Sequence, residues 1–326
     1  MLTSLDSALQ ERLTERLPIA DAYLVAVSGG RDSMVLLDWL VKAGFKNLTV
    51  LHFNHQLRGT ESDKDADLVS ARCEELNLAF ETGEGDVNAF ASAKKLSIET
   101  AARKMRYDWM AEIASRLGCN RLFLAHHADD QVETVLINLF RGSGARGISG
   151  MDEFSTRTIG ETEMKLLRPF LTIPRSEIDR YVAEHGVRFR EDQSNAEGFA
   201  LRNRLRNDLL PRISECFERD VSGAVLRAAE LARLDEALIT ELTPAPLTLN
   251  HGLDVAALRT TPEALRNRQL LRWLQQSGVP NCGQREVLKV AEVALSQAKP
   301  AKTNLPGNFH ARRKEGVLFI ESPSKA

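Results

Sequence analysis

The sequence predicts an α/β protein with a doubly wound, mostly parallel sheet, followed by a smaller C-terminal α+β domain. Between Tyr23 and Phe140, short apolar runs rich in β-branched and aromatic residues alternate with longer stretches that carry helix caps. Strands that alternate with helices build βαβ units, whose strands run parallel. Polar loops follow three of the apolar runs, and the composition changes beyond Arg141.

Four strands are expected in the first part of the chain, at 23–27, 48–53, 79–82 and 121–125. The sequence predicts helices at 4–17, at 33–43, from Thr60 onward, at 98–117 and at 130–140. Caps support two of them: Gly44 closes the second helix, and Ser97 and Gly118 flank the helix at 98–117. The loops after Val27, Phe53 and Ala125 should then open on one edge of the sheet and surround one crevice.

Beyond Arg141 the expected elements change in kind. A glycine-rich stretch at 142–147 precedes a hairpin with its turn near Gly160, and a helix then ends at Gly186. From about residue 218 we expect two or three helices and a terminal hairpin. We therefore expect an N-terminal domain with a helical extension at 1–217 and a C-terminal domain at 218–326.

The composition is that of a globular protein with room for two domains. The chain has 326 residues, of which 43% are hydrophobic and 27% are charged. The 43 basic and 45 acidic residues leave a net charge of −2. A nucleic-acid partner must therefore meet a local basic face, because the protein as a whole is not basic.

The four cysteines (Cys73, Cys119, Cys216 and Cys282) are far apart and form no Cys-x-x-Cys pair. The sequence thus offers no evident zinc or iron–sulfur site, and this cysteine usage suits a reducing compartment. The first residues do not begin a signal peptide, and no apolar run approaches the length of a membrane span. We expect a cytoplasmic protein with no membrane partner and no resident metal site.

The strongest motif is the loop between the first strand and its helix, which reads Ser28, Gly29, Gly30, Arg31, Asp32, Ser33. A glycine turn that opens a helix collects unpaired backbone N–H groups and binds phosphate. Adjacent glycines let the backbone take φ > 0 and approach an anion closely. Asp32 could cap the helix or hold Mg²⁺. The loop lacks the Walker A lysine and the dinucleotide-binding fingerprint, so its alternative is an ordinary βα turn with a serine cap.

A second motif follows the fourth strand and contains two histidines and three carboxylates. Asp130 and Glu133 are three residues apart in the first turn of a helix, where they can share one face and hold an ammonium group. Acidic capping of the helix N-terminus is the alternative. A zinc site is disfavoured, because the adjacent His126 and His127 would point apart on an extended chain.

Two arginine pairs are candidate anion contacts. Arg103 and Arg106 lie three apart on a helix and can face one anion, such as the phosphates of a nucleotide or an adenylate; a solvated basic face explains them equally well. Arg202 and Arg206 share a helical face next to Asn203, as expected for contacts to RNA phosphates. Salt bridges to nearby acids are the alternative for this second pair.

The loop at 28–33 resembles the pyrophosphate-binding loop of the N-type ATP pyrophosphatases, and the joint set of motifs resembles the family of tRNA(Ile)-lysidine synthetases. The resemblance is dense over residues 20–212 and loose over 220–322. Gln56 stands where the family usually has glycine, and longer members carry a second C-terminal domain. The motifs that carry it are 28–33, 54–63, 102–107, 126–134, 141–144, 168–170, 191–195 and 202–211.

This resemblance implies ATP-dependent ligation of free L-lysine onto the wobble cytidine of the isoleucine tRNA with a CAU anticodon. ATP, bound with Mg²⁺ at 28–33, would adenylate the base and release diphosphate. The lysine amine would then displace AMP, giving lysidine and changing the codon and amino-acid specificity of the tRNA from methionine to isoleucine. It implies that Asp130, Glu133 and His127 bind lysine and assist catalysis.

The resemblance further implies that Arg202, Asn203, Arg206 and the C-terminal domain bind tRNA. The oligomeric state is left open, with a homodimer as one alternative. The alternative enzyme is an ATP-dependent tRNA sulfur transferase of the same superfamily, which needs a persulfide cysteine or a cluster. No cysteine lies in the motif loops. A non-catalytic RNA-binding protein that senses ATP is a third hypothesis, disfavoured because carboxylates in the crevice would repel RNA phosphates.

Overall fold

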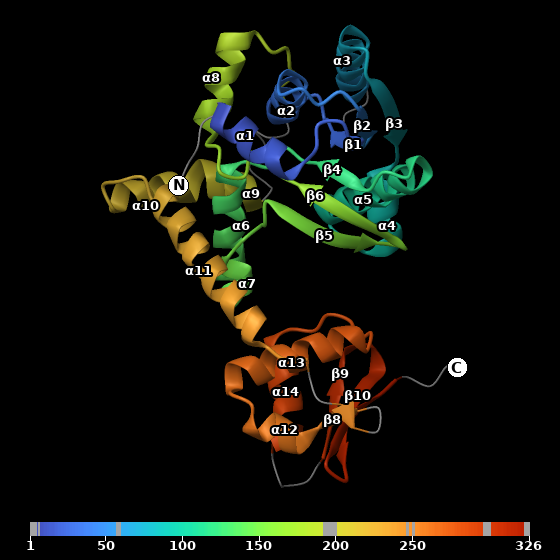
Figure 1. Cartoon of the computed structure of the whole chain (residues 1–326), viewed down its shortest axis with the longest axis vertical. Coiled ribbons are helices and arrows are strands. Elements are labelled where there is room, and N and C mark those ends of the chain that lie inside the picture. Colours follow the sequence, from blue (N-terminus) through green and yellow to red (C-terminus); the bar gives the residue numbers. More distant parts are fainter. Residues whose placement is uncertain are drawn as a thin grey trace. The chain divides into compact units, whose positions relative to one another are not determined.

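The computed structural model describes residues 5, 7–56, 60–191, 201–245, 248–249, 252–295 and 301–322. Its internal contacts divide the chain into two compact units, Met1–Arg233 and Leu234–Ala326, each of which has its own sheet (Figure 1). The parts of two motifs at 57–59 and 192–195 lie outside the described residues.

The first unit is built on a six-stranded sheet in the order β3-β2-β1-β4-β6-β5. All neighbouring pairs are parallel except β5 and β6, which form an antiparallel hairpin at one edge. The expected doubly wound, mostly parallel sheet is confirmed. Its strands are β1 (Tyr23–Ala26), β2 (Leu48–Asn54), β3 (Ala79–Glu84), β4 (Arg121–Phe123), β5 (Phe154–Ile159) and β6 (Thr162–Leu167).

Helices connect these strands and cover both faces of the sheet. They are α1 (Ser7–Arg16), α2 (Arg31–Lys42), α3 (Thr60–Leu76), α4 (Val87–Lys94), α5 (Ile98–Leu117), α6 (Ala128–Phe140), α7 (Ala145–Ile148) and α8 (Arg175–His185). After residues 192–200 come α9 (Leu201–Arg204), a π-helical turn (Leu205–Leu209), α10 (Leu210–Cys216) and α11 (Ser222–Leu242).

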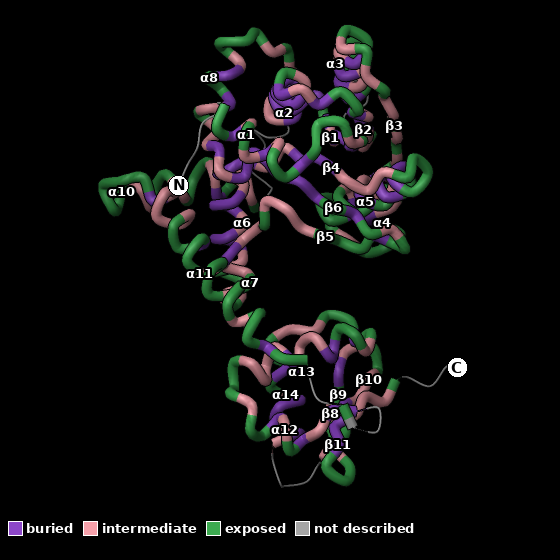
Figure 2. Tube along the Cα trace, in the orientation of Figure 1, coloured by how far each residue is buried: buried purple, intermediate pink, exposed green. Residues whose placement is uncertain are grey.

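Neighbouring residues of one strand supply the two faces of the sheet, as the period of two requires. Val25 of β1 packs into a core shared with α1, α2, α3 and α8. Leu24, one residue earlier, packs into a second core with α5. Figure 2 shows the buried residues gathered inside each unit. Helices on both faces leave the carboxyl edge of the strands as the place where polar loops meet.

Some local differences from the sequence-based expectation have clear causes. Helix α2 begins at Arg31 because Gly30 is its N-cap, without a side-chain cap hydrogen bond, so Asp32 does not cap it. Helix α6 begins at Ala128, because His127 is its N-cap and the Asp130 side chain accepts a hydrogen bond from the His127 amide at 3.1 Å. Helix α4 was missed because it is short; Asp86 caps it.

The second unit contains a five-stranded antiparallel sheet in the order β7-β8-β11-β10-β9, packed against three helices. The expected terminal hairpin is present, and the α+β class is confirmed. The strands are β7 (Thr248–Leu249), β8 (Gly252–Asp254), β9 (Lys302–Leu305), β10 (Phe309–Lys314) and β11 (Val317–Glu321), with a 3₁₀ turn at Pro306–Asn308. The helices are α12 (Val255–Thr260), α13 (Glu263–Gln276) and α14 (Gln284–Leu295).

The division between the units falls within α11, after Arg233, whereas composition places it at 217/218. The first turns of α11 belong to the first unit because Val225 and Leu226 pack on Val132 and Leu136 of α6. Among the described residues, no helix is both long enough and apolar enough to cross a membrane.

A buried carboxylate joins three helices beside the glycine loop. Asp38 of α2 accepts hydrogen bonds from Arg72 of α3 and from the Tyr181 hydroxyl of α8, both at 2.8 Å, and Lys42 is 2.9 Å away. Burial opposes the charge of Asp38, but hydrogen bonds from Lys42 and Tyr181 outweigh it and hold the pKa of this carboxyl below its usual range. Asp38 therefore fixes how α3 and α8 flank α2.

We expect Asp38→Asn to lower the free energy of unfolding by about 1–3 kcal/mol, because it weakens charge-assisted hydrogen bonds at a buried position. The folded-state pKa of Asp38 is depressed, so its contribution is present above the unfolded-state pKa and is lost as pH falls through the folded-state value. Denaturant unfolding at several pH values should show the deficit shrinking in acid. Asp108→Asn, which breaks an exposed pair with Lys104, is the control and should change stability by less than about 0.5 kcal/mol.

Candidate functional site

Hydrogen bonds of its two serines, Ser28 and Ser33, fix the conformation of the glycine loop between β1 and α2. The Ser33 hydroxyl accepts a hydrogen bond from the Ser28 amide at 3.1 Å and donates one to the Gly30 carbonyl at 2.9 Å. The Ser28 hydroxyl accepts from the Gly30 amide at 3.3 Å. This network fixes a loop at the N-terminus of α2, where unpaired amides favour an anion.

Gly29 is required by the loop conformation. Its φ is 86°, and a Cβ at this position would approach the Asp65 Cβ and carbonyl oxygen to 3.3 Å. The side chain of Arg31, in contrast, leaves the loop: it pairs with Asp179 and Glu191 and lies over the Phe189 ring. Arg31 thus anchors the loop to α8 and the segment after it, and only its backbone belongs to the anion site.

Asp32 points from the loop toward α6. Its Oδ2 lies 3.6 Å from Nε2 of His127, and no described residue makes a hydrogen bond to its buried Oδ1. Burial acts against its charge, but His127, with Arg175 and Arg31, outweighs it and keeps the pKa of Asp32 below its usual range. An ionised carboxylate with one unsatisfied oxygen, beside a phosphate-binding loop, fits a divalent cation that prefers oxygen ligands.

His127 connects the glycine loop to α6 and is 1% exposed. Its Nε2 lies 3.6 Å from carboxylate oxygens of Asp32 and of Asp130, and its Nδ1 lies 3.2 Å from a carboxylate oxygen of Asp129. Burial alone would lower the pKa of His127, but the three carboxylates raise it to about 10. The ring is therefore an imidazolium at neutral pH and donates to the acids around it.

Glu133 is the most deeply buried acid of the site, at 1% exposure. Its Oε1 accepts a hydrogen bond from Nε of Arg206 at 2.6 Å, and Nη2 of Arg206 also lies 3.4 Å from Oδ1 of Asp130. Its Oε2 has Arg202 3.6 Å away but no hydrogen bond. Burial raises the pKa of Glu133 despite Arg206, so this carboxylate is the one best able to take up a proton.

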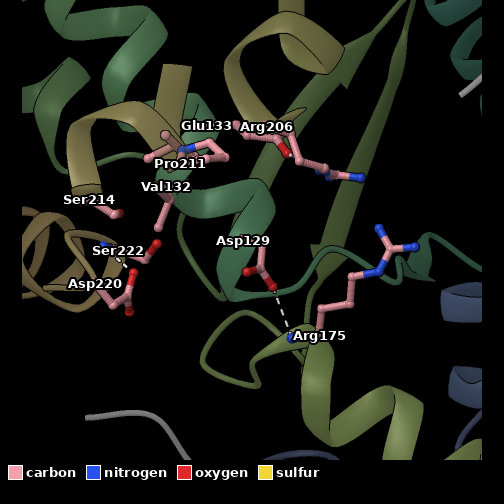
Figure 3. A pocket seen from close by; sticks show the side chains of 10 residues that line it. Asp129, Val132, Glu133, Arg175, Arg206, Pro211, Ser214, Asp220 and Ser222 are labelled. Atoms are coloured by element: carbon pink, nitrogen blue, oxygen red, sulfur yellow. Dashed lines mark hydrogen bonds and ion pairs between the residues drawn. The ribbon is translucent and has the colours of Figure 1, made fainter. Parts of the chain in front are cut away.

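A cavity of about 270 Å³ lies beside these groups. Figure 3 shows Glu133 and Arg206 near one another along its wall and Asp129 bonded to the backbone nitrogen of Arg175. This volume suits a small ligand with a charged end. The cavity is lined by Asp129, Val132, Glu133, Arg175, Arg206, Leu210, Pro211, Ser214, Asp220 and Ser222.

The other predicted arginine pair lies apart from these acids. Arg103 and Arg106 project from α5 around the Tyr107 ring, with guanidinium carbons 4.9 and 5.8 Å from its centroid. Burial and the nearby Arg106 together lower the pKa of His55 to about 4. Burial, together with the nearby arginines, also holds the pKa of His126 well below its usual range. The crevice therefore has an acidic part and a basic part.

The structure brings together residues that the sequence treated as separate groups. Arg202 and Arg206 share a face as expected, but both meet Glu133. Asn203 lies between them on α9. Gln56 has a φ of 53°, the left-handed conformation that glycine adopts most easily.

Tyr107 and Arg168 lie in the motifs at 102–107 and 168–170, but the sequence predicts no role for either residue. No periodicity or spacing singles them out. Nothing in the sequence marked the cavity residue Arg175 either.

The chain matches two family models. A PP-loop domain model matches residues 2–213, and a TilS substrate binding domain model matches residues 253–319. Its fold resembles that of the U34-tRNA thiolase from Methanococcus maripaludis, with a TM-score of 0.51 and 14% identity over 70% of this chain and 79% of that one. That likeness concerns the fold alone.

Several curated relatives carry the name tRNA(Ile)-lysidine synthase. The Geobacter sulfurreducens protein is 38% identical over 76% of this chain and 53% of its own length. The Bacillus subtilis protein is 38% identical over 68% of this chain and 46% of its own length. The Chlorobaculum tepidum protein is 38% identical over 72% and 70%. The chain thus spans about half the length of the first two relatives.

We expect His127 and His55 to titrate far apart in metal-free protein without nucleotide. His127 should remain protonated at pH 8, and His55 should be neutral at pH 6. Because the pKa of His127 is raised on folding, its contribution to stability is complete below about pH 6.5 and is lost as pH rises toward 10. Ring chemical shifts of selectively labelled histidine would show both titrations. A His127 titration near pH 6.5 would mean that the carboxylates do not surround it as described.

Proposed function

The chain belongs to the family of tRNA(Ile)-lysidine synthases, and on that premise we propose that it ligates free L-lysine to the wobble cytidine of the isoleucine tRNA with a CAU anticodon. The reaction uses ATP, releases AMP and diphosphate, and forms a carbon–nitrogen bond. One observation supports this best: a phosphate-binding loop and a buried carboxylate, Glu133, meet in one crevice through His127 and Asp130.

The first step activates the base at the glycine loop. The carbonyl oxygen of the cytosine attacks the α-phosphorus of ATP, and diphosphate leaves toward the amides of Ser28–Ser33. Asp32 would share Mg²⁺ with the phosphates, since one of its oxygens has no hydrogen-bond partner and no described cluster of three or more ligands could hold a metal alone. An anticodon base is already single-stranded, so it can enter the crevice at low cost.

The second step needs a neutral amine. The lysine nitrogen attacks the adenylated carbon, AMP leaves with the oxygen, and the amine loses a proton. Free lysine has a pKa near 10.4, so a base must assist at neutral pH. We assign this role to Glu133, whose pKa burial raises, with Asp130 orienting the ammonium and His127 holding Asp130 in place.

Arg206 already pairs with the two carboxylates that a lysine ammonium would use. Its guanidinium bonds to Glu133 and approaches Asp130, so a lysine ammonium has to share or replace these contacts. We propose that RNA phosphates compete for Arg206 and Arg202 when tRNA binds. Arg206 lies within the π-helical turn at Leu205–Leu209, a feature frequent at functional sites, and Arg202 lies in α9 just before it.

The remaining partners follow from the same proposal. Arg202, Asn203 and the C-terminal unit bind tRNA, and Arg103 and Arg106 contact a phosphate of the tRNA or the adenylate formed on its cytidine. The reaction takes place in the cytoplasm, where tRNA and free lysine are available. Whether the enzyme acts as a homodimer stays a question for its solution state.

A tRNA sulfur transferase is the alternative function, since this chemistry occurs on the same fold. The cysteines argue against it. All four are unpaired: Cys73 is buried, burial raises its pKa to about 11, and Cys216 lies exposed at the end of α10. None lies in the glycine loop or at the start of α6, where a persulfide would have to reach the activated base.

The decisive experiment asks whether radiolabelled lysine enters tRNA only when ATP is present. We expect one AMP and one diphosphate for each lysine incorporated. Asp32→Asn keeps the shape of the side chain but removes its charge at the phosphates, so it should abolish diphosphate release while the fold persists. Sulfur incorporation in place of lysine, or diphosphate release at the wild-type rate by Asp32→Asn, would contradict the proposal.

Glu133→Gln should separate the two steps. Adenylation involves ATP and the base only, so diphosphate release should largely survive. Lysine transfer should lose roughly ten- to a hundredfold in kcat/KM, because a charge-assisted hydrogen bond worth about 1.5–3 kcal/mol is weakened. Adenylated tRNA should accumulate in a single turnover. Glu99→Gln is the control, because Glu99 is an acid in the exposed first turn of α5 whose only expected role is to stabilise the N-terminus of that helix. Normal lysine kinetics in Glu133→Gln would return Glu133 to a structural role.

A further inference from the structure

Four arginines from three separate segments converge on one buried tyrosine. Arg103 and Arg106 come from α5, Arg157 comes from the edge strand β5, and Arg168 follows β6. The guanidinium carbons of Arg103, Arg106 and Arg157 lie 4.9, 5.8 and 5.1 Å from the centroid of the Tyr107 ring. Tyr107 is 2% exposed and Arg168 is 6% exposed, whereas Arg103 and Arg157 reach the surface.

These cations have no ion-pair partner within the described part of the chain. Arg168 donates to the Asp152 carbonyl and the Ser155 hydroxyl, and the Asp152 carboxylate acts on it only at longer range. Elsewhere in this unit, half-buried arginines such as Arg72 and Arg206 are paired with carboxylates. The cluster is therefore an exception to how this protein neutralises its arginines.

Among the described residues, three buried polar atoms in and beside the cluster also have no hydrogen-bond partner. They are the Tyr107 hydroxyl, Nε of Arg168 and Nδ1 of His126. The hydroxyl interacts electrostatically with the Arg106 and Arg168 guanidiniums, so it belongs to the centre of the cluster. Buried donors are normally satisfied, and an unsatisfied one commonly marks a place that a ligand or ion completes.

The like charges make the empty cluster unfavourable. Burial lowers the pKa of Arg106, and Arg103 lowers it further. Burial and four arginines, including Arg202 of α9, lower the pKa of His126. Cations at this spacing repel one another more strongly when they are partly withdrawn from water. An anion that accepts several N–H and O–H donors at once would remove both the repulsion and the unsatisfied donors.

We propose that the Tyr107 cluster, defined as Arg103, Arg106, Tyr107, Arg157 and Arg168, is a phosphate-binding site for the tRNA backbone beside the nucleotide that reacts. The proposal rests on the proposed function, since it needs tRNA as the substrate. The guanidinium fork and the hydroxyl match phosphate oxygens. The site lies next to His126 at the end of β4, and from there the basic field continues to Arg202.

An RNA phosphate fits this place better than a phosphate of ATP. The glycine loop already supplies amides for the nucleotide at the N-terminus of α2, which packs in the core with α1, α3 and α8. Tyr107 packs in the other core, with α5 and the β5–β6 hairpin. The two surface arginines make the site accessible to a polymer.

The test is the salt dependence of tRNA binding by the full chain. The double substitution Arg103→Gln/Arg157→Gln should make the fall of log affinity with log salt concentration less steep. The slope should decrease in magnitude by at least about 0.7, the value for one lost phosphate contact on a single strand. Lys104→Gln, which removes one charge from the same helix but from an exposed pair with Asp108, should leave the slope unchanged. The affinity for ATP should stay the same in both.

Tyr107→Phe isolates the hydroxyl. Because this hydroxyl makes no hydrogen bond within the described residues, its removal should leave the free energy of unfolding unchanged, yet weaken tRNA binding on the order of tenfold. If the Arg103→Gln/Arg157→Gln protein has the same salt slope as Lys104→Gln, the proposal is overturned. A weakened ATP affinity with an unchanged slope would also overturn it and assign the cluster to the nucleotide.

Inorganic phosphate provides a measurement that does not depend on tRNA. It should raise the melting temperature of the wild type and of Lys104→Gln more than that of the doubly substituted protein, because binding to the folded state stabilises it. Equal shifts would refute a phosphate site here even if lysidine is formed. If the wild type incorporates no lysine into tRNA while only the doubly substituted protein loses the phosphate-induced shift, that result would support the phosphate site and contradict the proposed function.

Discussion

The crevice depends on one buried cation. The imidazolium of His127 stands between the carboxylates of Asp32, Asp129 and Asp130, and so joins the glycine loop to the start of α6. Without a positive charge there, three acids around a buried position would repel one another and take up protons. With it, Asp32 stays ionised beside the phosphate loop. The charge of Asp32 beside the glycine loop therefore depends on a residue at the N-terminus of another helix, α6.

A second consequence of this arrangement is the separation of charge along the carboxyl edge of the sheet. Acids gather where α2 meets α6, and arginines gather where α5 meets the β5–β6 hairpin, with His126 between them. An ammonium substrate and a polyanionic substrate make opposite demands on one small site. In the proposed reaction, the ammonium and the RNA would bind to different parts of this edge, so one group of charges need not serve both. The low net charge of the chain is compatible with this division, because each partner meets a local field.

The partner of Arg206 could be identified only from the fold. On the sequence it looked like a contact for RNA phosphates or a partner for nearby acids, and spacing could not separate the two. The structure pairs it with Glu133, 73 residues away. That pairing does not exclude RNA, since a guanidinium held by one buried carboxylate keeps donors for another anion. Under the proposed function, the amine site and the RNA contacts would therefore share one side chain, Arg206, which neither motif alone would reveal.

The sequence by itself determined the order of strands and helices, the phosphate loop and the position of the acidic turn, because these depend on local patterns: apolar runs, caps and a glycine pair at a helix start. Only the tertiary structure decided which charges are buried and what neutralises them. The pairing of Glu133 with Arg206, the imidazolium of His127 and the gathering of Arg157 and Arg168 around Tyr107 all join segments far apart in the chain. Burial and partner choice set the pKa and the use of each group, and both arise from packing between such segments, which residue spacing does not encode.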